Sequence, residues 1–211
     1  MGGYTVAGGK FSKKKSGEPN EELTWQENLV LYLHDIVTYV TVILVVFLLV
    51  FRVIVVCGSS MYSTLVGGDY LLLLSNLFYR DPQPGDIVVV SKESFDDGAP
   101  IVKRIIATEG QIVDIDFVNG IVYVDGLPLD EPYLNTPTNR DEGMAFPMLI
   151  EENCYFIMGD NRNNSKDSRH PDIGMIDTRE ILGRAVFLIF PGMGEDNHEA
   201  PRDFDRIGVL N

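Results

Sequence analysis

One long apolar segment dominates the hydrophobic pattern of the chain. Residues 36–56 consist of aliphatic side chains and Phe, interrupted only by Thr38, Tyr39, Thr41 and Arg52. About 20 helical residues, each rising 1.5 Å, cross a hydrocarbon core of roughly 30 Å. Arg52 stands near one end, where its side chain can reach the lipid headgroups. The pattern predicts a transmembrane helix over residues 36–56.

The residues on either side of this span indicate its orientation. Three lysines at positions 13–15 precede it, whereas the first basic residue after Arg52 is Arg80. The positive-inside rule then favours a cytoplasmic, partly helical segment over residues 1–35. No A-x-A-like cleavage site follows the span, which favours an uncleaved anchor. We expect a single-pass protein of the cell membrane with residues 57–211 outside the cytoplasm.

After residue 65 the pattern changes to short hydrophobic stretches separated by turns. Enrichment in β-branched residues predicts strands over residues 71–74, 86–91, 101–108, 111–117, 121–126, 154–160 and 181–190. Residues 131–149 contain three prolines and little periodicity, so they are expected to form a loop. The acidic tail after Pro191 is expected to be an exposed end. Residues 57–211 should therefore form a mostly β domain with a loop-rich insertion around residues 109–152.

Charge and cysteine content narrow the functional classes. Residues 57–211 hold 12 of the 17 basic residues and 26 of the 31 acidic ones, so this part carries the whole net charge of −14. Such a surface repels phosphate backbones, which argues against nucleic-acid binding. Two cysteines do not make a disulfide framework. Cys57 and Cys154 are both expected to be small buried hydrophobic residues.

Candidate nucleophilic serines stand directly after the span, in the stretch CGSSMYSTL of residues 57–65. A serine such as Ser60 becomes a nucleophile only when a neighbouring base takes its proton. Of the three histidines, His34 precedes the span and His198 lies in the tail. His170 is the remaining imidazole candidate, although a histidine beside Pro171 also fits an ordinary solvated loop position.

Lys103 is the second candidate base. Period-2 alternation in IVKRIIAT places Lys103 on one face of a strand together with Ile101 and Ile105. Burial on that face would lower the pKa of the amine from about 10.4 toward neutrality. The alternative is a lysine at a sheet edge, with its aliphatic stem lying on the surface.

A polar loop, GDNRNNSKDSR over residues 159–169, is the third candidate element. Calcium binding fits poorly, because Arg162 falls where an oxygen ligand is needed and Pro171 where the bidentate Glu should stand. The alternative is an Asn/Asp turn without a functional role. The loop could also fix a neighbouring amine by hydrogen bonds from its serines and acids. No metal or cofactor is expected.

Five segments, GSSMYSTL, GDIVVVS, IVKRIIATEG, DEPYLN and GDNRNNSKDSR, occur in this order behind one apolar span. In this the sequence resembles the bacterial type I signal peptidases, membrane-anchored Ser-Lys proteases, over residues 36 to 190. It is most similar to a Gram-positive-like branch. The resemblance implies a β peptidase domain behind one transmembrane helix. It also implies removal of N-terminal signal peptides from secreted preproteins at the outer membrane surface, with these preproteins and the lipid bilayer as partners.

The same resemblance implies roles for individual residues. Ser60 would be the nucleophile and Lys103 the general base, with the backbone N–H of Ser60 donating to the oxyanion. Ser165 would hydrogen-bond the lysine, while Asp167 and Arg169 would hold the loop beside it. Gly58 stands where some members carry a further hydroxyl, and Ser63 replaces a usual proline.

Two other functions remain open at this stage. One is a Ser-Lys protease dedicated to a single surface protein. The other is a non-catalytic, membrane-anchored β module that binds a partner. The sequence leaves the oligomeric state open.

Overall fold

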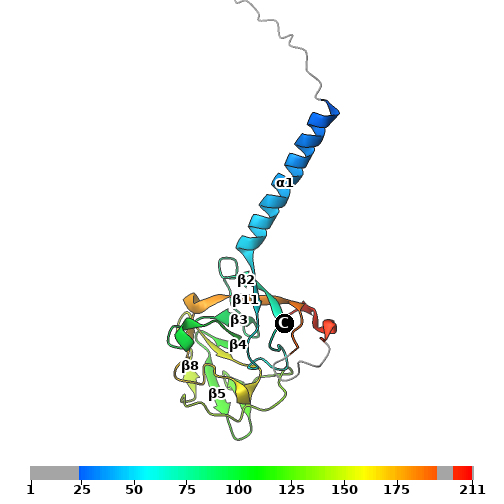
Figure 1. The fold of residues 1–211 in the computed structure, drawn as a ribbon. Helices are drawn as coiled ribbons and strands as arrows, with labels where there is room; N and C mark the ends of the chain where they lie inside the picture. The colour runs from blue at the N-terminus through cyan, green and yellow to red at the C-terminus, as the bar shows by residue number, and fades with distance from the viewer. Residues whose placement is uncertain (1–23, 194–201, 211) are drawn as a thin grey trace, which may run out of the picture. The chain divides into compact units, whose positions relative to one another are not determined.

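The computed structural model describes residues 24–193 and 202–210 (Figure 1). The chain divides into two compact units, residues 1–43 and residues 44–211, which meet within helix α1 (Trp25–Val50). The predicted cytoplasmic segment 1–35 therefore lies mostly outside the described residues.

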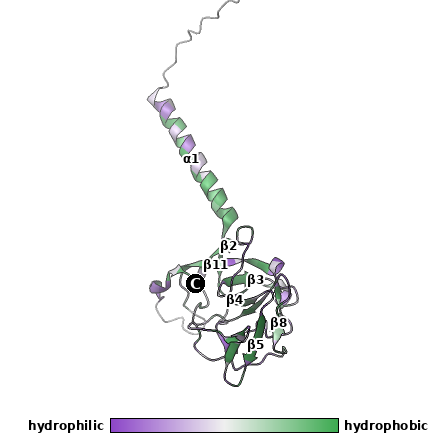
Figure 2. Cartoon of the chain, turned by 180° about the vertical axis from the view of Figure 1, so that it is seen from behind, coloured by the Kyte–Doolittle hydropathy of each residue, from purple (hydrophilic) through white to green (hydrophobic). Residues whose placement is uncertain are grey.

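Helix α1 contains one candidate membrane span, Asn28–Val50, with a mean hydropathy of 2.4. Figure 2 shows hydrophobic residues along most of its length. At 1.5 Å per residue, its 23 residues are long enough to cross a bilayer.

The end of this helix differs from the prediction of a helix over residues 36–56. Helix α1 ends at Val50, and the next residues form strand β1 (Phe51–Val55). β1 pairs antiparallel with β2 (Tyr70–Ser75), with Phe51 opposite Leu74 and Val55 opposite Tyr70. Hydropathy continues unchanged across the boundary, whereas backbone pairing with β2 decides where the helix ends. Arg52 is thus a strand residue.

The domain is mostly β, as predicted, and is built from two antiparallel sheets. The larger, 8-stranded sheet has the order β1-β2-β11-β3-β4-β9-β10, with β12 added to β11. Figure 1 shows β2, β11, β3 and β4 in this succession. The strands not yet given are β3 (Ile87–Val90), β4 (Ile101–Thr108), β9 (Cys154–Met158), β10 (Ile176–Asp177), β11 (Ile181–Phe190) and β12 (Gly208–Val209).

The predicted loop-rich insertion contains the second sheet. Its 4 strands have the order β7-β6-β5-β8 and are β5 (Ile112–Asp116), β6 (Ile121–Val124), β7 (Leu127–Pro128) and β8 (Met148–Leu149). The loop excursion expected from the prolines is the irregular stretch of residues 129–147. Its ends come together because β5 pairs with β8 as well as with β6.

The central strands of the larger sheet are buried on both faces. All four residues of β3 are buried, and so are residues 103–107 of β4. A separate cluster packs beneath the segment that carries Ser60 and contains Val56, Met61, Leu65, Leu71, Ile87, Ala185 and Leu188. This packing fixes the position of the segment that follows β1.

The tail after Pro191 is predicted to be an exposed end, and residues 202–210 are exposed or half-buried, but they are also tied to the domain. β12 pairs with β11, and Leu210 packs against the cluster beneath Ser60. Arg206 binds the carboxylate of Asp69, with its Nη2 atom 2.7 Å from Oδ2. Asp69 is fully buried, so it needs a cationic partner, and the tail supplies one.

Candidate active site

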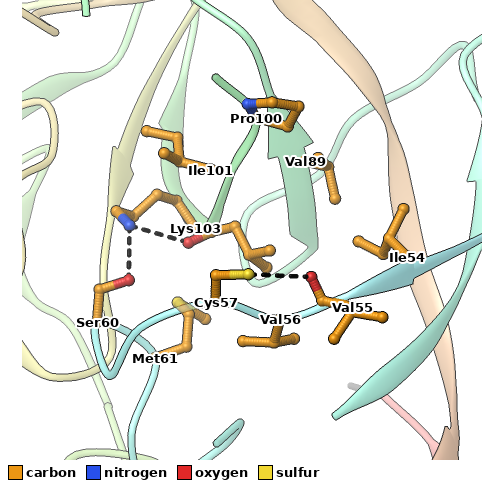
Figure 3. A pocket seen from close by; sticks show the side chains of 11 residues that line it. Ile54, Val55, Val56, Cys57, Ser60, Met61, Val89, Pro100, Ile101 and Lys103 are labelled. Atoms are coloured by element: carbon orange, nitrogen blue, oxygen red, sulfur yellow. Dashed lines mark hydrogen bonds between the residues drawn. The ribbon is translucent and has the colours of Figure 1, made fainter. Parts of the chain in front are cut away.

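Ser60 and Lys103 lie side by side, although they come from separate elements (Figure 3). Ser60 stands in the turn that follows β1, and Lys103 stands in β4, opposite Val88 of β3. The distance between Lys103 Nζ and Ser60 Oγ is 2.8 Å, and Nζ also donates to the carbonyl of Val102 at 3.0 Å. Lys103 is only 3 % exposed, so the burial predicted from its two isoleucine neighbours is confirmed. The edge-lysine alternative is wrong.

The surroundings of Lys103 make its ammonium group a stronger acid than that of an ordinary lysine. Burial lowers the pKa of Lys103 from 10.5 to about 8, because the interior solvates the ammonium poorly. The nearby carboxylates of Asp167, Asp160 and Glu142 act in the opposite direction. A substantial fraction of neutral amine is therefore present near neutral pH, and a neutral amine can accept a proton from a hydroxyl.

The polar loop after β9 makes hydrogen bonds to the segment that contains Ser59 and Ser60. The backbone N–H of Asn161 donates to the carbonyl of Ser60 at 2.9 Å, and its side-chain amide donates to the carbonyl of Ser59 at 3.0 Å. Asn164 reaches the hydroxyl of Ser59 at 3.1 Å. Gly159 must be glycine here, because a Cβ atom would collide with the carbonyl oxygen of Ser60. Sequence reasoning did not single out Asn161.

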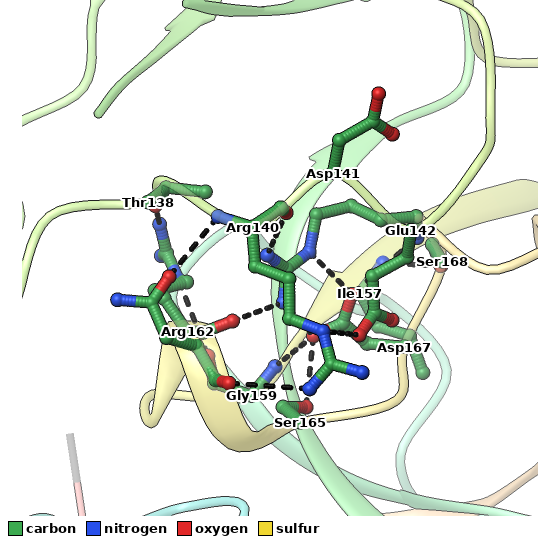
Figure 4. A network of polar contacts seen from close by, with 12 residues as sticks. Thr138, Arg140, Asp141, Glu142, Ile157, Gly159, Arg162, Ser165, Asp167 and Ser168 are labelled. Atoms are coloured by element: carbon green, nitrogen blue, oxygen red, sulfur yellow. Dashed lines mark hydrogen bonds and ion pairs between the residues drawn. The ribbon is translucent and has the colours of Figure 1, made fainter. Parts of the chain in front are cut away.

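Ser165, Asp167 and Arg169 are all buried in the same loop, and Figure 4 shows Ser165 beside Asp167. Asp167 and Arg169 form two parallel contacts of 2.8 Å, Nε to Oδ1 and Nη2 to Oδ2. The Asp167 carboxylate also accepts from the N–H of Gly159 at 2.9 Å. The pair thus braces the loop, in line with the supporting role that the resemblance implied.

The hydrogen bond expected between Ser165 and Lys103 is replaced by another. Ser165 Oγ donates to Asp167 Oδ2 at 2.8 Å, whereas, among the described residues, Lys103 Nζ bonds to Ser60 and Val102. A carboxylate is a stronger acceptor than an amine held by two other partners. Ser165 therefore acts through Asp167 in this structure.

Two further buried ion pairs involve residues of this loop. Arg104, next to Lys103, binds Asp160 and lies over the ring of Tyr133 at 4.1 Å. Arg162 is fully buried and pairs with Glu131, a residue of the loop excursion. Because Asp160 and Asp167 are each bound to an arginine, the geometry offers no support for calcium in this loop.

The other candidate residues lie apart from this arrangement. His170 Nδ1 accepts from the backbone N–H of Asp172 at 3.1 Å, a local loop contact. His198 lies outside the described residues.

Cys57 is exposed and Cys154 half-buried, so the prediction that both are buried is wrong. Cys57 directly follows the buried Val56 but faces the pocket beside Ser60. Gly58 has φ +83°, a backbone conformation that favours glycine.

An apolar pocket opens beside Ser60 and Lys103 (Figure 3). Its volume is about 370 Å³. Its walls are the segment from Ile54 to Met61 on one side and Pro100 to Lys103, with Val89, on the other. β4 pairs with β3 from Ile101 onward, whereas its pairing with β9 begins only at Arg104. The first half of β4 thus lines the pocket with a backbone edge that β9 does not cover.

Comparison with known proteins identifies the family of the chain. The family model described as "Signal peptidase, peptidase S26" matches residues 29–190. Signal peptidase I S of Bacillus subtilis is 32% identical over 181 residues, which cover 82% of this chain and 95% of that protein. A probable signal peptidase I-1 of Synechocystis is 37% identical over 142 residues, or 64% and 68% of the two chains. A crystal structure of a signal peptidase I from Enterococcus faecalis matches with 28% identity and a TM-score of 0.41, covering 50% of this chain and 97% of that one. By the extent of these matches, this chain belongs to the signal peptidase family, peptidase S26.

Proposed function

We propose that this protein removes signal peptides from secreted preproteins with Ser60 as nucleophile and Lys103 as general base. Membership of the signal peptidase family supports the reaction class, a peptide-bond hydrolysis. The observation that carries the residue assignment is the 2.8 Å contact between a buried amine and a hydroxyl at the edge of a pocket.

The geometry around Lys103 suits a base. A neutral amine has two N–H groups and one lone pair, and one N–H is directed to the Val102 carbonyl. This bond limits rotation about the last side-chain torsion and helps aim the lone pair at Ser60. Ser60 Oγ then attacks the scissile carbonyl while Lys103 takes its proton, and the ammonium returns that proton to the leaving amine. In the second half-reaction Lys103 activates the water that hydrolyses the acyl-enzyme.

The pocket suits an extended peptide with small apolar side chains. An extended segment placed along Ile101–Lys103 could pair with the backbone edge that β9 leaves uncovered, as added strands do. Alternate side chains would then enter the apolar pocket beside Ser60. The apolar walls favour apolar residues before the cleaved bond, and the resemblance to signal peptidases implies small ones.

Helix α1 would anchor the enzyme at the place where its substrates arrive. Ser60 follows the end of the helix by only ten residues. With the N-terminus in the cytoplasm, the β domain would act at the outer membrane surface, and lipid and preprotein would be its partners. A preprotein held in the same bilayer by its own apolar segment meets the enzyme at a raised effective concentration.

Cleavage of a purified preprotein by the full-length protein in detergent tests this proposal. Wild type should release the signal peptide, and Ser60→Ala and Lys103→Ala should lose this activity. Lys166→Ala, which removes an exposed lysine, is the matched control and should stay active. If His170→Ala abolishes cleavage while Lys103→Ala does not, the base is wrongly assigned.

The other two candidate functions give different outcomes in the same assay. A protease dedicated to one surface protein would cleave its own substrate but not a panel of unrelated preproteins. A non-catalytic binding module would cleave none of them, whether Ser60 is present or replaced.

A further inference from the structure

Asn161 holds both carbonyl groups that flank the Ser60 residue. Its side-chain amide donates to the carbonyl of Ser59 at 3.0 Å, and its backbone N–H donates to the carbonyl of Ser60 at 2.9 Å. Asn161 comes from the loop after β9, about a hundred residues further along the chain. One residue therefore fixes two successive carbonyls in the nucleophile turn.

The bond to Ser59 has a consequence for the N–H of Ser60. The carbonyl of Ser59 and the N–H of Ser60 belong to the same peptide group, which is planar and trans. In such a group the C=O and N–H bonds point in opposite directions. A hydrogen bond that fixes the carbonyl therefore fixes the direction of the N–H as well, and it also polarises that N–H as a donor.

The direction of the Ser60 N–H matters most if no side-chain hydroxyl also donates to the oxyanion. The resemblance to signal peptidases implies that the N–H of Ser60 donates to the oxyanion, and Gly58 offers no hydroxyl that could assist. The positive φ of Gly58 also places a residue of high intrinsic backbone freedom two positions before the nucleophile. Donors of this kind act only when they are held close to the required direction.

We propose that Asn161 is a positioning residue for the oxyanion hole, because its side-chain amide sets the plane of the Ser59–Ser60 peptide. The proposal rests on the proposed function, in which Ser60 forms a tetrahedral intermediate. Asn161 touches neither substrate nor reacting atoms in this role and acts through the peptide N–H.

Asn164 provides a matched control within the same loop. It is also an asparagine, and its side-chain amide also donates to Ser59, at 3.1 Å. Its acceptor is the Ser59 hydroxyl, however, and a bond to a side chain does not constrain the peptide plane. Asn161→Ala keeps the backbone bond from residue 161 to the Ser60 carbonyl and removes only the side-chain bond.

The first measurement is steady-state cleavage of a peptide substrate by full-length protein in detergent. Asn161→Ala should lower kcat by about 10- to 100-fold, somewhat less than complete loss of an oxyanion donor. KM and the pH dependence set by Lys103 should stay unchanged, because neither the pocket nor the base is altered. Asn164→Ala, which breaks only a bond to the Ser59 hydroxyl, should lower kcat clearly less than Asn161→Ala. Equal kcat values for Asn161→Ala and wild type would overturn the proposal.

The second measurement uses a peptide aldehyde that ends in alanine. Ser60 Oγ adds to the aldehyde carbon, its proton passes to Lys103, and the former carbonyl oxygen takes the negative charge at the oxyanion position. Affinity for the aldehyde should fall in parallel with kcat in Asn161→Ala, while affinity for the matching product peptide carboxylate is retained. Loss of affinity for both ligands would indicate general damage to the site and would overturn the proposal.

Two further variants separate the possible failures. Asn161→Asp keeps the size of the side chain but lacks the N–H donor, so it should show the same loss of kcat even if the alanine variant is poorly folded. Wild-type kcat in a folded Asn161→Asp protein would contradict the assignment. If wild type and Ser60→Ala cleave equally, the proposed function itself has failed, whatever the Asn161 variants do.

Discussion

Arg104 and Asp160 form a buried, two-pronged ion pair directly beside the Ser60–Lys103 pair. Arg104 Nε lies 2.9 Å from Oδ1 of Asp160, and its Nη2 lies 2.8 Å from Oδ2. Both side chains are almost completely inaccessible, at 3% and 0%. The ion pair joins β4, which carries Lys103, to the loop that holds the serine segment.

Breaking this ion pair should destabilise the whole domain. Arg104→Gln leaves the Asp160 carboxylate buried without its cation, which costs about 3–5 kcal/mol of unfolding free energy. Arg179→Gln is the matched control, because Arg179 makes the same two-pronged contact with Asp177 but is 89% exposed. Chemical unfolding of the detergent-solubilised protein measures both, and a similar small change in the two variants would contradict this expectation.

The rate of cleavage should follow the deprotonation of Lys103. Because only the neutral amine accepts the serine proton, and its pKa is about 8, kcat/KM should rise roughly tenfold per pH unit below pH 8. Above that pH it should level off. Rates measured from pH 6 to 10 on a short peptide substrate check this, and a flat profile from pH 6 to 9 would exclude a lysine base.

The same buried amine should make the wild-type protein less stable than a variant without it. In the unfolded chain Lys103 has its ordinary pKa of 10.5, so between pH 8 and 10.5 only the unfolded state holds the proton. The unfolding free energy therefore rises with pH in this window, and below pH 8 the full penalty of about 3 kcal/mol remains.

Lys103→Met tests this linkage with a side chain of similar length. It should raise the unfolding free energy at pH 6 by up to about 3 kcal/mol, and the gain should shrink toward zero at pH 10. Thermal and chemical unfolding at the two pH values measure it. An equal effect at pH 6 and pH 10 would mean that burial does not lower the pKa of Lys103.

Local patterns predicted most of the strands, and for Lys103 they left a buried and an edge position open. β-branched stretches marked β3, β4, β5 and β11, because such residues fit a pleated, buried surface. Alternation places Lys103 on the same face of β4 as Ile101 and Ile105. These features depend on neighbours within a few residues, so a sequence displays them.

Features that depend on distant partners were not predictable in this way. The helix was expected to end at residue 56, since pairing of β1 with β2 leaves no mark in hydropathy. Asn161 looks like an ordinary loop asparagine until its contact with Ser59 is seen. Ser165 could bond either the Lys103 amine of β4 or the Asp167 carboxylate of its own loop, and only the folded geometry selects Asp167.

Glu142 should tune the basicity of Lys103 from the loop excursion. Its side chain is 1% exposed, and its Oε1 atom lies 3.3 Å from Nε of Arg140. Burial raises the pKa of Glu142, and the charge of Asp167 adds to this. Once ionised, the Glu142 carboxylate stabilises the Lys103 ammonium and so raises the pKa of the lysine.

Glu142→Gln should therefore move the rising limb of the pH–rate profile to lower pH, because the neutral amine then forms more readily. Asp141→Asn removes the neighbouring exposed carboxylate and is the matched control, for which the limb should stay in place. The comparison needs only kcat/KM from pH 6 to 10 for wild type and the two variants. The two variants should differ because an exposed charge is screened by solvent and a buried one is not. A limb that moves to higher pH in Glu142→Gln, or that moves equally in both variants, would show that the buried carboxylate does not act on Lys103.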